Sequence, residues 1–205
     1  MECRLSVPGD GRRYPTEACM NSTLHQRLAE IQWHTFDSAC GFDSAEIPRL
    51  LVSLKSNDSF AAVQAANQLW NVVSHQANVG SNSVPTLPFL IELLSCSTNE
   101  IQSELLDIIY CFACHARMCA DGIESLSLTG WHRELASLLI ANRSTLDSFA
   151  RSDDQDLVEW SELIGEQLDV VARKLLQRRV TMRCTTSGEV QFVGVVNQSS
   201  PPRDR

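Results

Sequence analysis

The residues best suited to chemistry are three cysteines and a histidine in the middle of the chain. Two residues separate Cys111 from Cys114, His115 follows directly, and Cys119 lies four residues further on. Thiolates and imidazoles at this spacing can bind zinc, and Cys-x-x-Cys-His also matches an attachment site for c-type haem. On a helix the residues would share the face that has to pack, and cysteine is often buried as a small hydrophobic residue. We therefore predict a packing role for the cluster, with no metal and no cofactor; zinc and haem are the alternatives.

Two histidines lie 40 residues apart at equivalent positions of a sequence repeat. One is His75, which follows Trp70 and Asn71 and precedes Gln76, and the other is His115. Polar and aromatic groups at the same place in successive repeats can form a row that binds a protein partner. The alternative is that each imidazole caps the free carbonyl groups at the end of its helix. We include these five residues in a predicted partner-binding surface.

Carboxylates at helical spacing supply the rest of the predicted surface. Glu100, Glu104 and Asp107 lie about one turn apart if this segment is helical. Such groups can hold a cation or share a proton, and the alternative is a simple solvated helix face. The sequence has no nucleophile with an adjacent base and no glycine-rich phosphate loop, so we predict no catalytic residue.

The elements that position these residues follow from the 40-residue repeat. Its first copy opens at Ile47-Pro48 and its second at Leu87-Pro88, each followed by leucines at helical spacing, and Trp70 returns as Tyr110. A period near 40 residues made of two helices is typical of HEAT and armadillo repeats. A single helical hairpin cannot bury its apolar stripe, so such copies stack and share a core.

The repeat predicts an all-α fold, a short HEAT/armadillo-like α-solenoid of helical hairpins with a small C-terminal β-hairpin. Ser152 and Gln155 form a capping box at the start of a last long helix. After that helix the pattern changes to the alternation expected of a strand pair. The predicted parts are a flexible arm at residues 1–20, the solenoid at 21–180, the hairpin packed on it at 181–196, and a disordered tail at 197–205.

The net charge of −8 is unevenly distributed along the chain. Residues 84–170 contain 15 Asp and Glu against four Arg, a balance of −11, and the rest of the chain has a balance of +3. An acidic surface repels phosphate backbones, which argues against nucleic acid and favours a basic protein partner. No apolar run approaches the roughly 20 residues that span a bilayer, and no secretory signal precedes residue 20. We therefore predict a cytoplasmic monomer without membrane contact, whose eight cysteines are thiols.

One stretch carries a resemblance to a known family. The residues from Leu69 to Gln76, with Trp70 and the His-Gln pair, lead into Pro88-Phe89-Leu90 and then Glu-Leu-Leu ending at Leu94. This arrangement resembles a family of bacterial HEAT-repeat proteins, over about residues 25–120. The chain departs from the family pattern at two positions. Ala77 stands where the family has Gly after His-Gln. In the predicted C-terminal hairpin, where family members often have two cysteines, this chain keeps Cys184 and has Ser187 in place of the second.

The resemblance implies a function in protein binding. Some members of the family look like immunity proteins encoded beside antibacterial toxins, and most have no assigned activity. Our leading hypothesis is an immunity protein that neutralises a basic effector toxin by occluding its active site, because charge complementarity speeds association. A general HEAT scaffold that bridges cellular proteins is the first alternative. A HEAT-type lyase or DNA glycosylase is the second, although a glycosylase would need a basic groove.

Overall fold

The computed structural model describes residues 17–75, 78–123 and 127–180, and every regular element in these ranges is helical. The all-α prediction is therefore confirmed. The predicted β-hairpin and tail, residues 1–16 of the predicted arm, and Gln76 lie outside the described residues. The α-helices are α1 (Glu17–Ala29), α2 (Ile47–Ser53), α3 (Ser59–Ser74), α4 (Ser83–Leu94), α5 (Asn99–Asp121), α6 (Gly130–Ala141), α7 (Arg143–Asp147) and α8 (Gln155–Val180).

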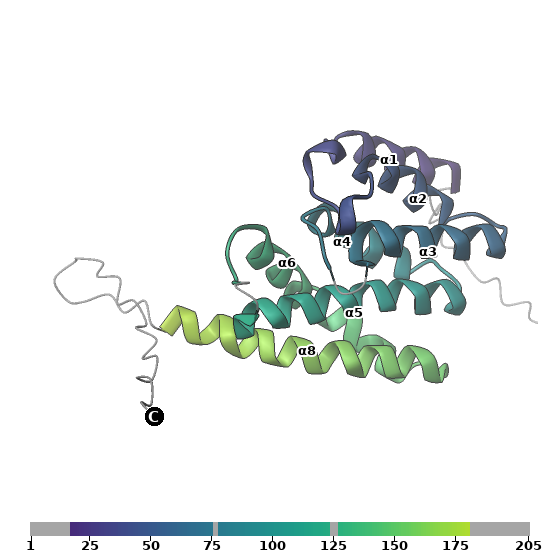
Figure 1. The fold of residues 1–205 in the computed structure, drawn as a ribbon. Coiled ribbons are helices and arrows are strands. Elements are labelled where there is room, and N and C mark those ends of the chain that lie inside the picture. The colour runs from purple at the N-terminus through teal and green to yellow at the C-terminus, as the bar shows by residue number, and fades with distance from the viewer. Residues whose placement is uncertain (1–16, 76–77, 124–126, 181–205) are drawn as a thin grey trace, which may run out of the picture.

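Three long helices lie side by side and form one layer (Figure 1). The central one is α5, which packs against α3 on one side and along much of α8 on the other. The shorter helices precede their long partners in the chain: α2 packs on α3, and α4 packs on α5. Helix α6 contacts both α4 and α5, while α7 is packed against α8. None of the described helices combines the length and apolar character needed to cross a membrane.

Local signals set several of the helix ends. Asp58 caps α3, because its Oδ1 accepts hydrogen bonds from the backbone N–H groups of Phe60 at 3.0 Å and Ala61 at 3.4 Å. Helix α5 continues to Asp121 and ends at Gly122, whose φ of 73° places it in the left-handed region that glycine adopts without strain. Helix α1 begins at Glu17, earlier than the predicted boundary at residue 21.

The core is centred on α5. Its apolar stripe is fully buried, as are the facing leucines of the neighbouring helices. Burial of this size provides most of the stability of a helical domain, since isolated helices of these lengths are marginal in water. The residues of α5 with at most 1% exposure are Leu105, Leu106, Ile108, Ile109, Phe112, Ala113, Ala116 and Cys119.

A non-helical segment between α1 and α2 is held against the turn that precedes α4. The backbone N–H of Asn82 donates to the Asp37 carbonyl at 3.1 Å, and the Asn82 side chain donates to Ser44 Oγ at 3.1 Å and the Val72 carbonyl at 3.2 Å. Asn82 is completely buried. At Gly80 the two backbones are so close that a Cβ would lie 2.2 Å from the Asp37 carbonyl oxygen. These contacts fix the position of the 36–46 segment against α3.

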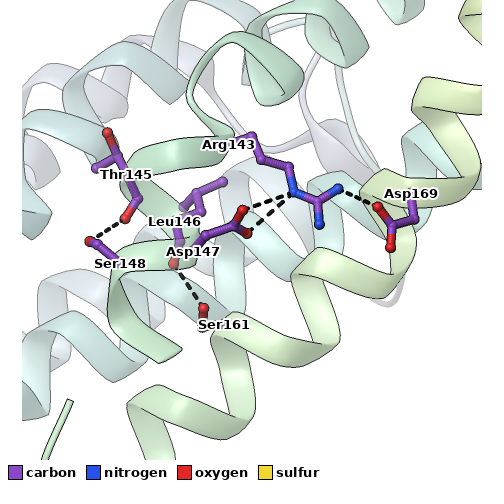
Figure 2. Close-up of polar contacts among 7 residues, drawn as sticks. All are labelled: Arg143, Thr145, Leu146, Asp147, Ser148, Ser161 and Asp169. Carbon is purple, nitrogen blue, oxygen red and sulfur yellow. Dashed lines mark hydrogen bonds and ion pairs between the residues drawn. The ribbon is translucent and has the colours of Figure 1, made fainter. Parts of the chain in front are cut away.

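An arginine joins α7 to α8 (Figure 2). Arg143 donates through Nε to Asp147 Oδ2 at 3.2 Å and through a terminal nitrogen to Asp169 Oδ1 at 2.7 Å. Nearby, the Ser161 hydroxyl donates to the Leu146 carbonyl at 2.8 Å. The acidic partners are substantially exposed, so the ion pairs orient α7 more than they stabilise the fold.

Candidate functional site

The structure brings most of the predicted partner-binding residues onto two neighbouring helices. We define the α3–α5 surface as Trp70, Asn71 and His75 at the end of α3 together with Glu100, Glu104, Asp107 and Cys111 on α5. Cys111 links the two groups, because it is close enough to Trp70 and Ser74 of α3 and to Asp107 of α5 for each of them to shift the pKa of its thiol. Asp107 and Cys111 therefore lie beside the end of α3, and Glu104 and Glu100 continue the row one and two turns further back along α5.

An aromatic cluster surrounds His75, the residue at which α3 ends. The ring lies 5.6 Å from that of Trp70 and 5.9 Å from that of Phe42, in edge-to-face arrangements. Its Nδ1 and the Asn71 Oδ1 are 2.9 Å apart, and with the hydrogen on Nδ1 the ring donates to the amide oxygen. The imidazole of His75 thus bonds to the side chain of Asn71, one turn back in α3, and not to a carbonyl at the helix end.

Phe42 is a residue of this cluster that sequence reasoning missed. It belongs to the 36–46 segment, and its side chain is 45% exposed, which is high for a large apolar group. The segment reaches His75 only because Asn82 and Ser81 anchor it beside α3. An aromatic residue next to a turn at Gly41 was the one signal available, and it does not predict which helix the residue will contact.

Glu100, Glu104 and Asp107 of α5 form a row that has no basic partner in residues 17–75, 78–123 and 127–180. Glu100 is exposed, whereas Glu104 and Asp107 are half-buried. Burial raises the pKa of Glu104, and the charges of Asp107 and Glu100 raise it further; burial also raises the pKa of Asp107. Among the described residues none of the three carboxylates forms an ion pair, since every recorded pair involves other acids. Within the described part of the chain, the α3–α5 surface therefore holds negative charge that no basic side chain compensates and that is partly shielded from water.

The thiols of Cys111 and Cys114 lack the lowered pKa of an activated nucleophile. Burial, followed by the charge of Asp107, raises the pKa of Cys111 to about 11, although Ser74 and Trp70 lower it in part. Burial likewise raises the pKa of Cys114. A thiol with a raised pKa stays protonated at neutral pH, and the thiolate is the reactive form. Both side chains pack as half-buried, neutral groups, which agrees with the packing role predicted from their sequence.

His115 is not part of the α3–α5 surface. It is 6% exposed and its ring stacks on those of Trp131 and His132 in α6, at 5.5 Å and 5.3 Å. Because α5 continues to Asp121, the residue lies inside the helix and does not match the helix-end position of His75. Burial and the neighbouring His132 lower the pKa of His115 to about 4, so the ring is neutral at pH 7.

The fold and the α3–α5 surface define this chain as an all-α protein that has a row of carboxylates beside an aromatic cluster. No known family model, curated protein or solved structure matches the chain. Its function has therefore to be argued from its own residues.

We expect that neutralising the two half-buried carboxylates stabilises the protein at neutral pH. A folded-state pKa that is raised means that the protonated form fits the fold better, so wild-type stability is lost as the pH rises through the folded-state pKa values. Glu104→Gln with Asp107→Asn should raise the melting temperature at pH 7. The difference in melting temperature between variant and wild type should vanish at a pH below the ordinary pKa values of the two carboxyl groups, 4.5 for Glu and 3.8 for Asp.

The control for this prediction is a pair of exposed glutamates elsewhere, Glu30→Gln with Glu134→Gln, melted over the same pH range. Equal shifts for the two pairs, or a gain that persists at pH 3, would contradict the explanation from burial and charge repulsion.

Proposed function

We propose that this chain is a protein-binding module of the short HEAT-like solenoid type, and that its α3–α5 surface binds a basic segment of a protein partner. The specific form of the proposal is an immunity protein that neutralises an antibacterial toxin by covering its active site. The observation that carries it is the row of half-buried carboxylates on α5 without basic neighbours in the described residues. The cost of holding that charge is offset when a partner supplies arginine or lysine.

The solenoid part of the proposal is supported by the order of packing. Each of the pairs α2–α3 and α4–α5 is a helical hairpin, and the second helices of the pairs lie next to each other. Helix α8 continues the same layer after α5, with α6 in contact with both α8 and the preceding short helix α4. This is the arrangement expected when a 40-residue repeat stacks and is closed by a longer terminal helix.

The basic character of the partner is supported by two kinds of contact that the surface offers. The carboxylates would form ion pairs that are partly desolvated, and such pairs are stronger than those on an open surface. The partly exposed rings of Trp70 and Phe42 lie at one edge, where an arginine side chain can stack on an aromatic face. Aromatic residues are frequent anchors of protein interfaces.

A general scaffold remains the alternative, because it would use the same surface. The immunity proposal rests in addition on the resemblance of the Trp70 to Leu94 stretch to bacterial HEAT-repeat proteins. Cytoplasmic location belongs to the same proposal, since the partner toxin would be met inside the cell. A gene position directly beside a toxin gene favours immunity, and an isolated gene favours the scaffold.

The experiment that tests the function is affinity capture of the tagged protein from its native cells, with mass spectrometry of bound proteins. A basic protein enriched by capture, and rescue of cells that express that protein when this chain is co-expressed, are the expected results. Capture of a basic partner without any rescue would remove the immunity proposal and leave the scaffold. Failure to enrich any basic protein would remove the proposed surface chemistry altogether.

Reversing the carboxylate row should weaken binding without unfolding the protein. We expect Glu100→Lys, Glu104→Lys and Asp107→Lys together to lower the association rate with the captured partner by about tenfold or more at low salt, because electrostatic steering is lost. The wild-type rate should itself fall as salt rises. Rates are measured by surface plasmon resonance, with circular dichroism to check folding.

A matched control carries the same change of charge at three exposed glutamates away from this surface, namely Glu30→Lys, Glu134→Lys and Glu162→Lys. If this triple variant loses as much of the association rate as the α5 variant, net charge alone drives association and the α3–α5 surface has no special role.

A further inference from the structure

Helices α5 and α6 bring together three side chains with metal-binding chemistry. His115 and Cys119 lie four residues apart on α5, and His132 is in the first turn of α6. One donor atom from each side chain lies within 4.8 Å of the donor atoms of the other two. We refer to these residues as the His–Cys–His cluster. Cys111 and Cys114, the other thiols of the sequence motif, are not part of it.

We propose that the His–Cys–His cluster is a binding site for one zinc ion. Spacing of four residues places His115 and Cys119 on the same side of α5, one turn apart, so both can reach one ion. Two imidazoles and a thiolate are donors typical of zinc, which is borderline in softness, and are unlike the all-oxygen sets of calcium and magnesium. His115 and Cys119 lie roughly 17 and 22 Å along α5 from Glu104, at 1.5 Å per residue, and the site uses no residue of the α3–α5 surface, of which Cys111 is one turn from His115.

An unsatisfied nitrogen points to a ligand rather than to packing alone. His115 is 6% exposed, and its Nε2 is buried with no hydrogen-bond partner among the described residues. A buried polar atom without a partner destabilises the folded state, because it has lost its hydrogen bonds to water. Stacking on Trp131 fixes the plane of the ring but cannot satisfy that nitrogen. A metal ion beside Nε2 would satisfy it and would also explain why a thiol and a second imidazole lie next to it.

Binding requires the donor atoms to approach one another and the two imidazole rings, whose planes are 20° from parallel, to turn toward one ion. Zinc lies about 2.0 to 2.1 Å from nitrogen and about 2.3 Å from sulfur, so tetrahedral donors are roughly 3.3 to 3.7 Å apart. The cluster would therefore contract by about 1 Å. His132 is only partly buried and begins α6, so its rotation can supply much of that movement.

Binding releases the thiol proton of Cys119. Each imidazole donates a nitrogen lone pair to the ion, while Cys119 loses its proton to solvent and binds as the thiolate. Cys119 is fully buried, and burial raises its pKa to about 11, so the ion has to displace the proton. Three protein ligands leave a fourth position for water or a group of a partner, as in zinc sites that exchange a ligand.

Cobalt titration of the full-length protein, stripped of metal with a chelator, tests the site. We expect one Co²⁺ to bind per chain, with a thiolate-to-cobalt band in the near ultraviolet and the visible bands of four-coordinate cobalt. Zn²⁺ should displace the Co²⁺ and abolish these bands. Cys119→Ala should abolish the thiolate band, and His132→Gln should weaken Co²⁺ binding by about 100-fold. Cys114→Ala is the matched control, a half-buried cysteine of the same helix, and should bind like the wild type.

Two results would overturn the proposal. One is a wild-type protein without the thiolate band. The other is a Cys119→Ala variant that keeps the band, since other cysteines would then be the ligands. If a variant does not fold, X-ray absorption of the zinc-loaded wild type decides: we expect one sulfur with nitrogen neighbours, and a shell without sulfur or with several sulfurs contradicts the site.

Discussion

Leu105→Ala is expected to destabilise the protein by about 2 to 5 kcal/mol, the range found for buried leucines. The leucine is fully buried in the middle of α5, the helix against which α3, α4, α6 and α8 all pack. Truncation removes apolar burial and leaves a cavity that rigid neighbouring helices fill only in part. The measurement is the free energy of unfolding from chemical denaturation, with an unchanged denaturant slope if the folded and unfolded states keep their compactness.

Leu176→Ala is the matched control, because it is the same substitution at a residue of α8 that is 60% exposed. Its effect should remain within about 0.5 kcal/mol, as for most surface changes. If both variants lose the same stability, the central position assigned to α5 is incorrect.

Gly80→Ala is expected to destabilise the protein by about 2 to 3 kcal/mol, near the top of the range for overpacking. A Cβ at this position would lie 2.2 Å from the Asp37 carbonyl oxygen and 2.7 Å from the Ser38 carbonyl carbon. Both are backbone atoms, so the 36–46 segment has to move as a whole. That movement would break the hydrogen bonds to Asn82 and carry Phe42 away from His75.

The variant therefore has a second readout besides stability. Binding of the basic partner should weaken in Gly80→Ala under conditions in which the protein is still folded, because Phe42 borders the α3–α5 surface. The control is Gly165→Ala in α8, where a Cβ would meet nothing closer than 3.5 Å. There the change should be neutral or stabilise by up to about 1 kcal/mol, because alanine favours helices more than glycine. Destabilisation of similar size at both glycines would contradict the close backbone approach at Gly80.

Local patterns in the sequence predicted the helices well. The apolar spacing after Pro48 and Pro88 predicted α2 and α4. Such features depend on residues within one or two turns of one another, so the sequence is sufficient to read them. The capping box predicted for Ser152 and Gln155 is wrong: Ser152 accepts from the N–H of Asp154, and Asp154 caps α8 by accepting from the N–H of Asp156.

The candidate site was predictable only in part. Trp70, Asn71 and His75 share one helix, and Glu100, Glu104 and Asp107 share another, so each group follows from helical spacing. Equal spacing in the repeat also suggested that His75 and His115 are equivalent, but one ends α3 and the other is buried inside α5. The difference arises because α5 extends past His115 to Gly122, and because α6 covers that face with Trp131.

The sequence by itself determined that this protein is helical, acidic in its middle part and divided into two regular repeats, because composition and periodicity are local properties. The tertiary structure decided which side chains meet. Phe42 reaches His75 through a segment anchored at Asn82, and His132 replaces Cys111 and Cys114 as the neighbour of His115 and Cys119. Both pairings join residues 13 or more positions apart across non-helical connections, whose paths depend on packing of the whole domain and not on a periodic pattern.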